Sequence, residues 1–160
     1  MMNFRIGFGY DVHPLGKDRE LWLGGIKLEF ELGCVGHSDA DVLLHAICDA
    51  LLGAANLRDI GFHFPNTDPK YKGADSKLLL KEVNALLKKN NYNIGNIDAT
   101  LSLEAPKINP HIAAMQKVIA ATLEIEADQI SIKATTNEKL GYVGKGEGVN
   151  AYAVALIYKA

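Results

Sequence analysis

The chain has 160 residues, with 17 basic and 19 acidic side chains and a formal net charge of −2. This balance excludes a protein whose overall charge attracts nucleic acid or an anionic membrane surface. No apolar run approaches the roughly 18 residues of a membrane span, and Met1 to Arg5 lack a basic leader with an apolar core. We therefore expect a cytoplasmic protein with one domain over residues 1–160.

The two cysteines, Cys34 and Cys48, form neither a CxxC pair nor a repeating framework. Such cysteines are typical of small apolar side chains in a reducing compartment. We therefore expect both thiols to pack in the core.

The first predicted element is a strand from Phe4 to His13, because apolar and polar residues alternate with a period of two. Asp11 and His13 fall on one face of this strand. Same-face neighbours lie roughly 6.6 Å apart along a strand, so a carboxylate and an imidazole there can converge on one small ion. Residues 21–28 then predict a hairpin with the two-glycine turn Gly24-Gly25.

A mostly apolar helix is expected to follow Ser38, which can serve as its N-cap, with Asp41 three residues later in a near capping box. Asp41, His45 and Asp49 recur at i, i+4 and i+8, so they share one stripe. A buried helix needs a partner for each charge that it carries. We expect Asp41 or Asp49 to accept the second ring N–H of His45, with capping, a salt bridge or a subunit contact as alternatives.

The segment from Asp59 to Pro69 is rich in turn residues and is expected to be an irregular surface loop that binds a ligand. The later expected elements are a helix capped by Asp75 or Ser76, a strand over 93–104, a helix from Pro110 to Leu123, and strands over 130–135 and 149–158. This order predicts an α+β domain. We expect a two-layer sandwich whose helices cover one face of a mixed four-stranded sheet, plus the N-terminal hairpin.

Asp11, His13 and His45 form the first candidate site. Three nitrogen or oxygen ligands with an open fourth position are typical of catalytic zinc. The alternative is that His45 is a histidine whose hydrogen bonds are satisfied within the core.

Two segments suit phosphate. His37 and Ser38 precede the helix, whose N-terminus offers unpaired N–H groups and partial positive charge, although His37 can equally be an exposed loop residue and Ser38 only a cap. Residues 133–139 offer hydroxyls, backbone N–H groups and a carboxylate for phosphate oxygens and a hard cation such as Mg²⁺, with a plain polar strand end as the alternative. The glycine-rich 141–148 lacks GxxxxGK[ST], so we expect a flexible connection rather than a P-loop.

Six motifs follow one another along the chain: GYDVH (9–13), GHSDADVLLHAICDALLGAANLRDIG (36–61), FPNTDP (64–69), KGADS (72–76), APK with PHI (105–112), and KATTNEKLG with GKGEG (133–148). Together they resemble the family of 2-C-methyl-D-erythritol 2,4-cyclodiphosphate synthases, phosphorus–oxygen lyases of the non-mevalonate isoprenoid pathway. The match runs in order over nearly the whole chain, which implies a single cyclodiphosphate synthase domain over 1–160.

The resemblance implies a homotrimer with active sites between adjacent subunits. Its substrate would be 4-diphosphocytidyl-2-C-methyl-D-erythritol 2-phosphate, whose 2-phosphate attacks its own β-phosphate, expels CMP and closes a cyclic diphosphate. The attacking phosphate is already anionic near neutral pH, so the reaction needs charge neutralisation and alignment rather than a strong base.

The resemblance also implies residue roles. Asp11, His13 and His45 would bind Zn²⁺, Glu138 would help to hold Mg²⁺ or Mn²⁺ at the diphosphate, and His37 and Thr136 would steady the transition state. Ser38 would touch phosphate. The implied substrate-binding residues are Asp11, Val12, His13, His37, Ser38, Asp59, Ile60, Gly61, Phe64, Pro65, Asn66, Thr67, Asp68, Ala105, Pro106, Lys107, Ile108, Asn109, Thr135, Thr136, Asn137, Glu138, Tyr142 and Lys145.

Three positions depart from the family pattern. Asn137 stands where the family usually has Thr, Tyr142 where Phe is common, and Lys145 where Arg is common. In some members this arginine helps to hold an isoprenoid diphosphate in the central cavity of the trimer. Lysine keeps the charge but loses the bidentate fork, so an anion site at Lys145 should be weaker or differently shaped.

Two other functions are compatible with the same residues. A zinc-dependent phosphohydrolase would use the same ligands and release linear products, and a trimeric binding module for isoprenoid or nucleotide diphosphates would bind without turnover. Under each of them the ligand is a small phosphorylated molecule, and neither nucleic acid nor a membrane is an expected partner.

Overall fold

A mixed five-stranded sheet is the centre of the fold in the computed structural model, which describes residues 3–159. The expectation of a cytoplasmic protein rested in part on Met1 to Arg5. Of these residues, Met1 and Met2 lie outside the described range. The strands are ordered β4-β1-β7-β5-β6, and only β5 and β6 pair in parallel. Their bounds are β1 Asn3–Gly16, β4 Gly33–Cys34, β5 Asn93–Ser102, β6 Ile130–Thr135 and β7 Gly148–Lys159.

The predicted α+β class and mixed sheet are confirmed, but the prediction of four strands was wrong. The fifth strand, β4, has two residues and pairs with Leu15 and Gly16 at the end of β1. So short a strand shows no alternation in the sequence, because period-two patterning needs about four residues to be visible.

The predicted N-terminal hairpin is present as a separate two-stranded sheet of β2 (Leu21–Leu23) and β3 (Ile26–Leu28). Its turn residues, Gly24 and Gly25, have φ of +62° and +78°. Two consecutive positive φ angles are what a tight two-residue hairpin turn requires, and glycine adopts them without steric cost.

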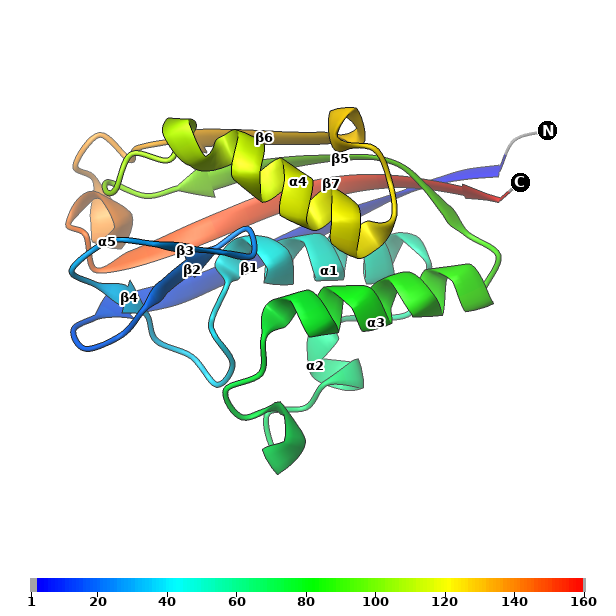
Figure 1. Cartoon of the computed structure of the whole chain (residues 1–160), viewed down its shortest axis with the longest axis horizontal. Helices are drawn as coiled ribbons and strands as arrows, with labels where there is room; N and C mark the ends of the chain where they lie inside the picture. Colours follow the sequence, from blue (N-terminus) through cyan, green and yellow to red (C-terminus); the bar gives the residue numbers. More distant parts are fainter. Residues whose placement is uncertain (1–2, 160) are drawn as a thin grey trace.

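Three longer helices cover the sheet (Figure 1). The helix α1 (Val42–Ala54) packs against β1 and β7, α4 (Ile112–Leu123) packs against β6, and α3 (Ser76–Lys89) packs against both helices. The shorter helices are α2 (Ile60–His63), α5 (Gly141–Gly144), η1 (Pro69–Tyr71), η2 (Asn109–His111) and η3 (Ala127–Gln129). Two segments expected to be irregular therefore contain helical turns: 59–69 holds α2, and 141–148 holds α5.

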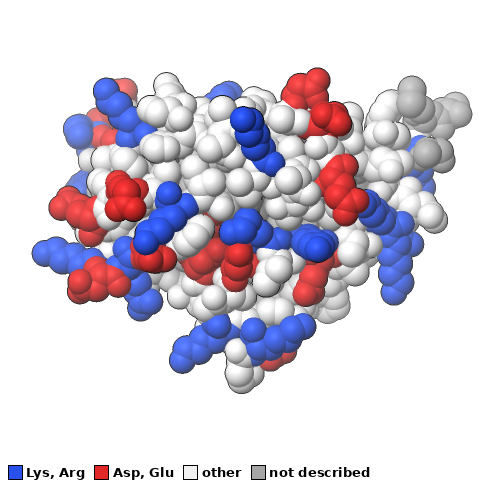
Figure 2. Space-filling model, in the orientation of Figure 1, with Lys and Arg blue, Asp and Glu red and all other residues white. Residues whose placement is uncertain are grey.

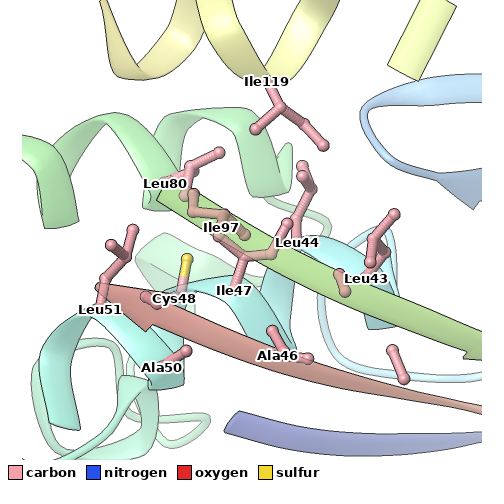
Figure 3. Close-up of a cluster of buried hydrophobic side chains, with 14 of the residues drawn as sticks. Leu43, Leu44, Ala46, Ile47, Cys48, Ala50, Leu51, Leu80, Ile97 and Ile119 are labelled. Carbon is pink, nitrogen blue, oxygen red and sulfur yellow. The ribbon is translucent and has the colours of Figure 1, made fainter. Parts of the chain in front are cut away.

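The helix α1 forms the middle of the core, and Figure 3 shows its side chains meeting Leu80 of α3, Ile97 of β5 and Ile119 of α4. Within α1, all residues other than Asp49 and Gly53 are buried. Cys34 and Cys48 are both buried, and burial raises the pKa of each thiol. The expectation that they pack as small apolar residues is confirmed.

The helix α1 begins later than expected. Its N-cap is Asp41, whose side chain accepts a hydrogen bond from Leu44 N, and its first residue is Val42. The prediction that Ser38 caps the helix, with Asp41 inside its first turn, was wrong. Ser, Asp and a following apolar run satisfy the same capping pattern in two registers, so the sequence alone does not separate them.

Two glycines bring α1 unusually close to the sheet. A Cβ on Gly7 would lie 1.9 Å from the carbonyl oxygen of Ala50, and one on Gly9 would lie 1.9 Å from that of Ala46. Any side chain at either position would push the helix away from β1. The glycines of β1 therefore let α1 settle against the strand that carries Asp11 and His13.

The other face of the sheet is open among residues 3–159. It exposes large side chains, namely Phe4, Ile6, Phe8, Tyr10, Val12, Tyr152 and Val154. Apolar areas of this extent are typical of protein–protein contacts. On the side of the molecule seen in Figure 2, acidic and basic side chains are mixed without a broad area of one sign. No helix within the described range is long and apolar enough to cross a membrane.

Candidate metal-dependent active site

Three side chains converge at the contact between β1 and α1. Asp11 Oδ2 lies 3.0 Å from His13 Nε2 and 2.9 Å from His45 Nδ1, and the two histidine nitrogens are 3.3 Å apart. Donors bound to one tetrahedral Zn²⁺ at about 2.1 Å are separated by about 3.4 Å. The three atoms therefore fit a shared metal ion with small adjustments, as the sequence pattern predicted.

The protonation of this cluster suits a metal ligand set. Burial raises the pKa of Asp11, but hydrogen bonds with His13 and His45 outweigh it and lower the pKa to about 2. The carboxylate is therefore ionised near neutral pH, as a metal ligand must be. His13 Nδ1 lies 3.1 Å from the carbonyl oxygen of Val35. An Nδ1–H donated to this carbonyl leaves the Nε2 lone pair free to face the metal position.

Neither Asp41 nor Asp49 accepts a hydrogen bond from His45, although both lie on the same stripe of the sequence. Asp41 accepts from the backbone N–H groups of Gly24, Gly25 and Leu44, at 3.0, 2.7 and 3.1 Å. Asp49 accepts from Ile60 N at 2.8 Å. Residues four apart on a helix are rotated by about 40°, so Asp41 and Asp49 diverge to either side of His45. The expectation that one of them supports His45 was wrong.

The Nε2 atom of His45 instead faces two hydroxyl groups. Ser76 Oγ lies at 2.9 Å and Ser38 Oγ at 3.2 Å. Ser76 is buried at the start of α3, and sequence reasoning treated it only as a possible helix cap. The only signal in the sequence was its position at the end of the KGADS motif.

His37 and Ser38 lie beside the metal ligands, although not at a helix N-terminus as expected. Ser38 Oγ accepts from Ala40 N at 3.1 Å. Asp41 places a carboxylate at the true start of α1, which opposes anion binding there. His37 Nε2 is buried and has no hydrogen-bond partner among the described residues. An unpaired ring nitrogen of this kind can donate to an anionic oxygen of a ligand.

A cavity of about 160 Å³ joins these residues to the 59–71 segment. Among its lining residues are Asp11, His13, His37, Ser38, His45, Ile60, Gly61, Phe64 and Asn66, all of them predicted, and also Tyr71 and Leu79, which the sequence reasoning missed. Asp59 and Asp68 were expected here as well. Their carboxylates instead cap α2 and η1, accepting from Phe62 N and Lys70 N, each at 2.9 Å. Pro65 and Thr67 do not line the cavity.

A second cavity, of about 390 Å³, lies where β5 and β6 end. Its lining includes the predicted residues Pro106, Lys107, Ile108, Asn109, Thr135 and Thr136, but not Ala105. This cavity shares no residue with the first. Within a single chain, the predicted substrate-binding residues therefore fall into two separate groups, one at each cavity.

Glu138 lies on the loop that follows β6. It has φ of +50°, and its carboxylate is 3.3 Å from Thr136 Oγ1. Glu104, which the sequence reasoning did not single out, holds this loop by accepting from Asn137 N at 2.9 Å and from Lys139 N at 3.4 Å.

Further predicted substrate contacts, Glu138 among them, also line neither cavity. Val12 points to the open face of the sheet, and Asn137 accepts a hydrogen bond from Ser102 Oγ at 2.6 Å. Tyr142 meets Asn150 Nδ2 at 3.0 Å, and Lys145 is exposed. In the isolated chain these side chains do not converge on the metal ligands.

The fold and the site together define an α+β protein with a candidate metal site. A carboxylate and two imidazoles meet at a cavity that also contains an unpaired imidazole nitrogen, so a metal ion and an anionic ligand can be held side by side.

Comparison with known proteins identifies the family. The sequence model of the YgbB family matches residues 4–158. A 2-C-methyl-D-erythritol 2,4-cyclodiphosphate synthase from Cytophaga hutchinsonii is 63% identical over 158 residues, 99% of each chain. The structure of the bifunctional IspDF from Campylobacter jejuni is similar with a TM-score of 0.96 at 39% identity, covering 100% of this chain and 43% of that longer chain. The CDP complex of IspF from Plasmodium falciparum gives 0.86 at 35% identity, covering 98% of this chain and 97% of that one.

The chain belongs to the YgbB family, in which relatives 58% to 63% identical to it are 2-C-methyl-D-erythritol 2,4-cyclodiphosphate synthases. The resemblance drawn from the six motifs is confirmed, and with it the enzyme class, a lyase of isoprenoid biosynthesis.

Proposed function

We propose that the chain converts 4-diphosphocytidyl-2-C-methyl-D-erythritol 2-phosphate to 2-C-methyl-D-erythritol 2,4-cyclodiphosphate and CMP. The observation that carries this assignment is the convergence of Asp11, His13 and His45 within one cavity with the unpaired Nε2 of His37. In the reaction an oxygen of the 2-phosphate forms a bond to the β-phosphorus. The bond from that phosphorus to the bridging oxygen breaks, and the electron pair leaves with CMP.

Zn²⁺ held by Asp11, His13 and His45, with Mg²⁺ or Mn²⁺ held in part by Glu138, would supply charge neutralisation at the diphosphate when bound. Side chains of the protein supply hydrogen bonds to the phosphate oxygens. His37 donates from its unpaired ring nitrogen to a phosphate oxygen, and the hydroxyl of Thr136 does the same from the second cavity. Both hydrogen bonds gain strength as charge develops on these oxygens.

The cavity at the metal ligands excludes bulk water on one side. Phe64 is buried and lines this cavity next to Ile60 and Leu79. Apolar walls here limit hydrolysis of the β-phosphate, which would otherwise compete with ring closure. The backbone and side chains of residues 59–68 would hold the erythritol and ribose groups.

A homotrimer would complete the site. The two cavities share no residue within one chain, and the open face of the sheet exposes apolar side chains that a second subunit can bury. In this arrangement the metal cavity of one subunit meets the cavity at Lys107 and Thr135 of its neighbour. The relative from Plasmodium falciparum is a CDP complex. We assign the cytidine of the substrate to the second cavity, with Pro106 to Asn109 and Thr135 around it.

The test is turnover of the pure substrate with Zn²⁺ and Mg²⁺ supplied. Phosphorus NMR should show a cyclic diphosphate and CMP in equal amounts. Linear phosphorylated products would identify a zinc-dependent phosphohydrolase. Tight binding without any product would identify a diphosphate-binding module, and either result overturns the proposal.

A further inference from the structure

We propose that Asp39 and Ser76 form a hydrogen-bond relay that fixes His45 as a metal ligand. Both act as positioning residues, since neither is among the three converging ligands. The inference rests on the proposed function, because it assumes that the Asp11–His13–His45 cluster binds zinc.

The relay is continuous over three side chains. His45 Nε2 lies 2.9 Å from Ser76 Oγ, and Ser76 Oγ donates a hydrogen bond to Asp39 Oδ1. The other carboxylate oxygen, Asp39 Oδ2, accepts from Ser76 N at 2.9 Å. Asp39 therefore holds Ser76 at two points, which fixes the direction in which the hydroxyl points.

The arrangement of donors and acceptors decides which ring nitrogen of neutral His45 carries the hydrogen. An ionised carboxylate can only accept, so the single hydroxyl hydrogen of Ser76 goes to Asp39. The oxygen of Ser76 is then left to accept, and it must accept from His45 Nε2–H. When a metal ion is bound and the hydrogen is on Nε2, the lone pair of Nδ1 faces the metal position between Asp11 and His13. The relay thus selects the tautomer that a metal ion at this position needs.

Burial makes the relay effective. Ser76 is fully buried and His45 is 7% exposed, so water does not compete for these hydrogen bonds. Asp39 itself is partly buried, and its negative charge polarises the buried hydroxyl of Ser76 and, through it, the imidazole. Such outer partners raise the basicity of a ligating histidine.

Ser38 is a weaker substitute for Ser76. Its hydroxyl oxygen is 3.2 Å from the same nitrogen and already accepts from Ala40 N. It also lines the cavity in which we place the phosphate groups. When Ser38 turns to the substrate, Ser76 remains the partner of His45.

The relay also ties three segments together. Asp39 lies in the loop before α1, its backbone N–H donates to Ala74 O at 3.0 Å, and Ser76 is the first residue of α3. The start of α3 is thereby coupled to the metal-bearing face of α1.

The experiment compares the zinc affinity of Ser76→Ala with that of the unmodified protein, by competition with a chromophoric chelator. We expect the dissociation constant to rise roughly 10–100-fold, the range measured for outer partners of metal ligands. The matched control is Asp75→Ala. Asp75 is the N-cap of the same helix and accepts from Lys77 N, so this variant weakens α3 without touching the relay. Its zinc affinity should not change.

Nitrogen-15 NMR of the zinc-loaded protein supplies a second readout. The Nε2 proton of His45 should exchange slowly with water in the unmodified protein and faster in Ser76→Ala and in Asp39→Asn. If Ser76→Ala does not fold, the exchange rate of the His45 Nε2 proton in the unmodified protein tests the relay by itself. A proton that exchanges as fast as that of an exposed imidazole overturns the relay.

The two proposals fail in different ways. If the unmodified protein binds no zinc, the metal centre of the proposed function is wrong and the relay falls with it. If the unmodified protein binds zinc, His45→Ala loses it, and Ser76→Ala binds as tightly as the unmodified protein, the metal centre stands and the relay alone is wrong.

Discussion

At the scale of single residues, Asp11 on β1 and Asp41 at the N-cap of α1 have different roles because their surroundings differ. Asp11 is ionised beside two imidazoles, whereas Asp41 is fully buried and joins the hairpin turn to α1 through three backbone N–H groups. Burial raises the pKa of Asp41, and these hydrogen bonds act against that effect. The first carboxylate belongs to the candidate metal site, and the second stabilises the fold.

For Asp41→Ala we expect a loss of roughly 3 kcal/mol in the free energy of unfolding, because three buried N–H groups lose their acceptor. Denaturant unfolding of the metal-free protein measures it. Asp49→Ala is the control, since it removes one hydrogen bond to a half-buried partner and should cost about 1 kcal/mol. Equal effects of the two substitutions would contradict the role given to Asp41.

His45→Ala should lose stoichiometric zinc and turnover while the protein still folds. The substitution removes one of three ligands, whereas the apolar side chains that hold α1 in the core stay in place. Elemental analysis, with circular dichroism as the check on folding, measures both outcomes. Zinc retained at one ion per chain would refute the ligand assignment.

At the scale of elements, the approach of α1 to β1 decides whether a metal site exists at all. Asp11 and His13 belong to the strand, His45 belongs to the helix, and Gly7 and Gly9 set the distance between them. The proposed metal site thus depends on how the helix packs against the strand.

Gly9→Ala should therefore weaken zinc binding at least tenfold and destabilise the protein, because a Cβ would lie 1.9 Å from Ala46 O. The control is Gly53→Ala within α1, where the nearest atom to a new Cβ is Phe8 O at 3.9 Å. There alanine should stabilise the helix by up to about 1 kcal/mol and leave zinc binding unchanged. Zinc titration and thermal unfolding test the pair, and zinc binding by Gly9→Ala that matches the unmodified protein would show that the close approach is dispensable.

At the scale of the whole molecule, the two cavities and the open sheet face are explained together if the active site is shared between subunits. Each chain then contributes the metal half of one site and the cytidine half of the next. This arrangement predicts complementation between two inactive variants.

The experiment mixes equal amounts of His45→Ala and Glu138→Gln subunits, then unfolds and reassembles them together. A shared site is active when its metal half has His45 and the half from the neighbouring subunit has Glu138. Random assembly gives this combination in one site of four, so about a quarter of the unmodified activity should return. Each variant reassembled alone should be inactive, which serves as the control. A mixture that is no more active than either variant alone would mean that the site lies within one chain.

The sequence by itself determined the class of fold and the chemistry of the metal ligands. Alternation along residues 4–13 placed Asp11 and His13 on one face, the hairpin followed from two glycines, and the ordered motifs identified the family. These features are local, or are fixed by residue identity, and so can be predicted without knowing which elements touch.

Only the tertiary structure decided which groups complete the site. Ser76 lies 31 positions from His45, and Asp39 lies 37 from Ser76, so their contact depends on how α3 packs against α1. Likewise, the positions of the hairpin and of α2 beside α1 decided that Asp41 bonds the turn at Gly24 and Gly25 and that Asp49 bonds Ile60, against expectation. Helical spacing sets the direction of a side chain around the axis but not the neighbour that lies there. Two-residue β4 and the separation of the two cavities are likewise consequences of long-range pairing, which leaves no periodic signal in the sequence.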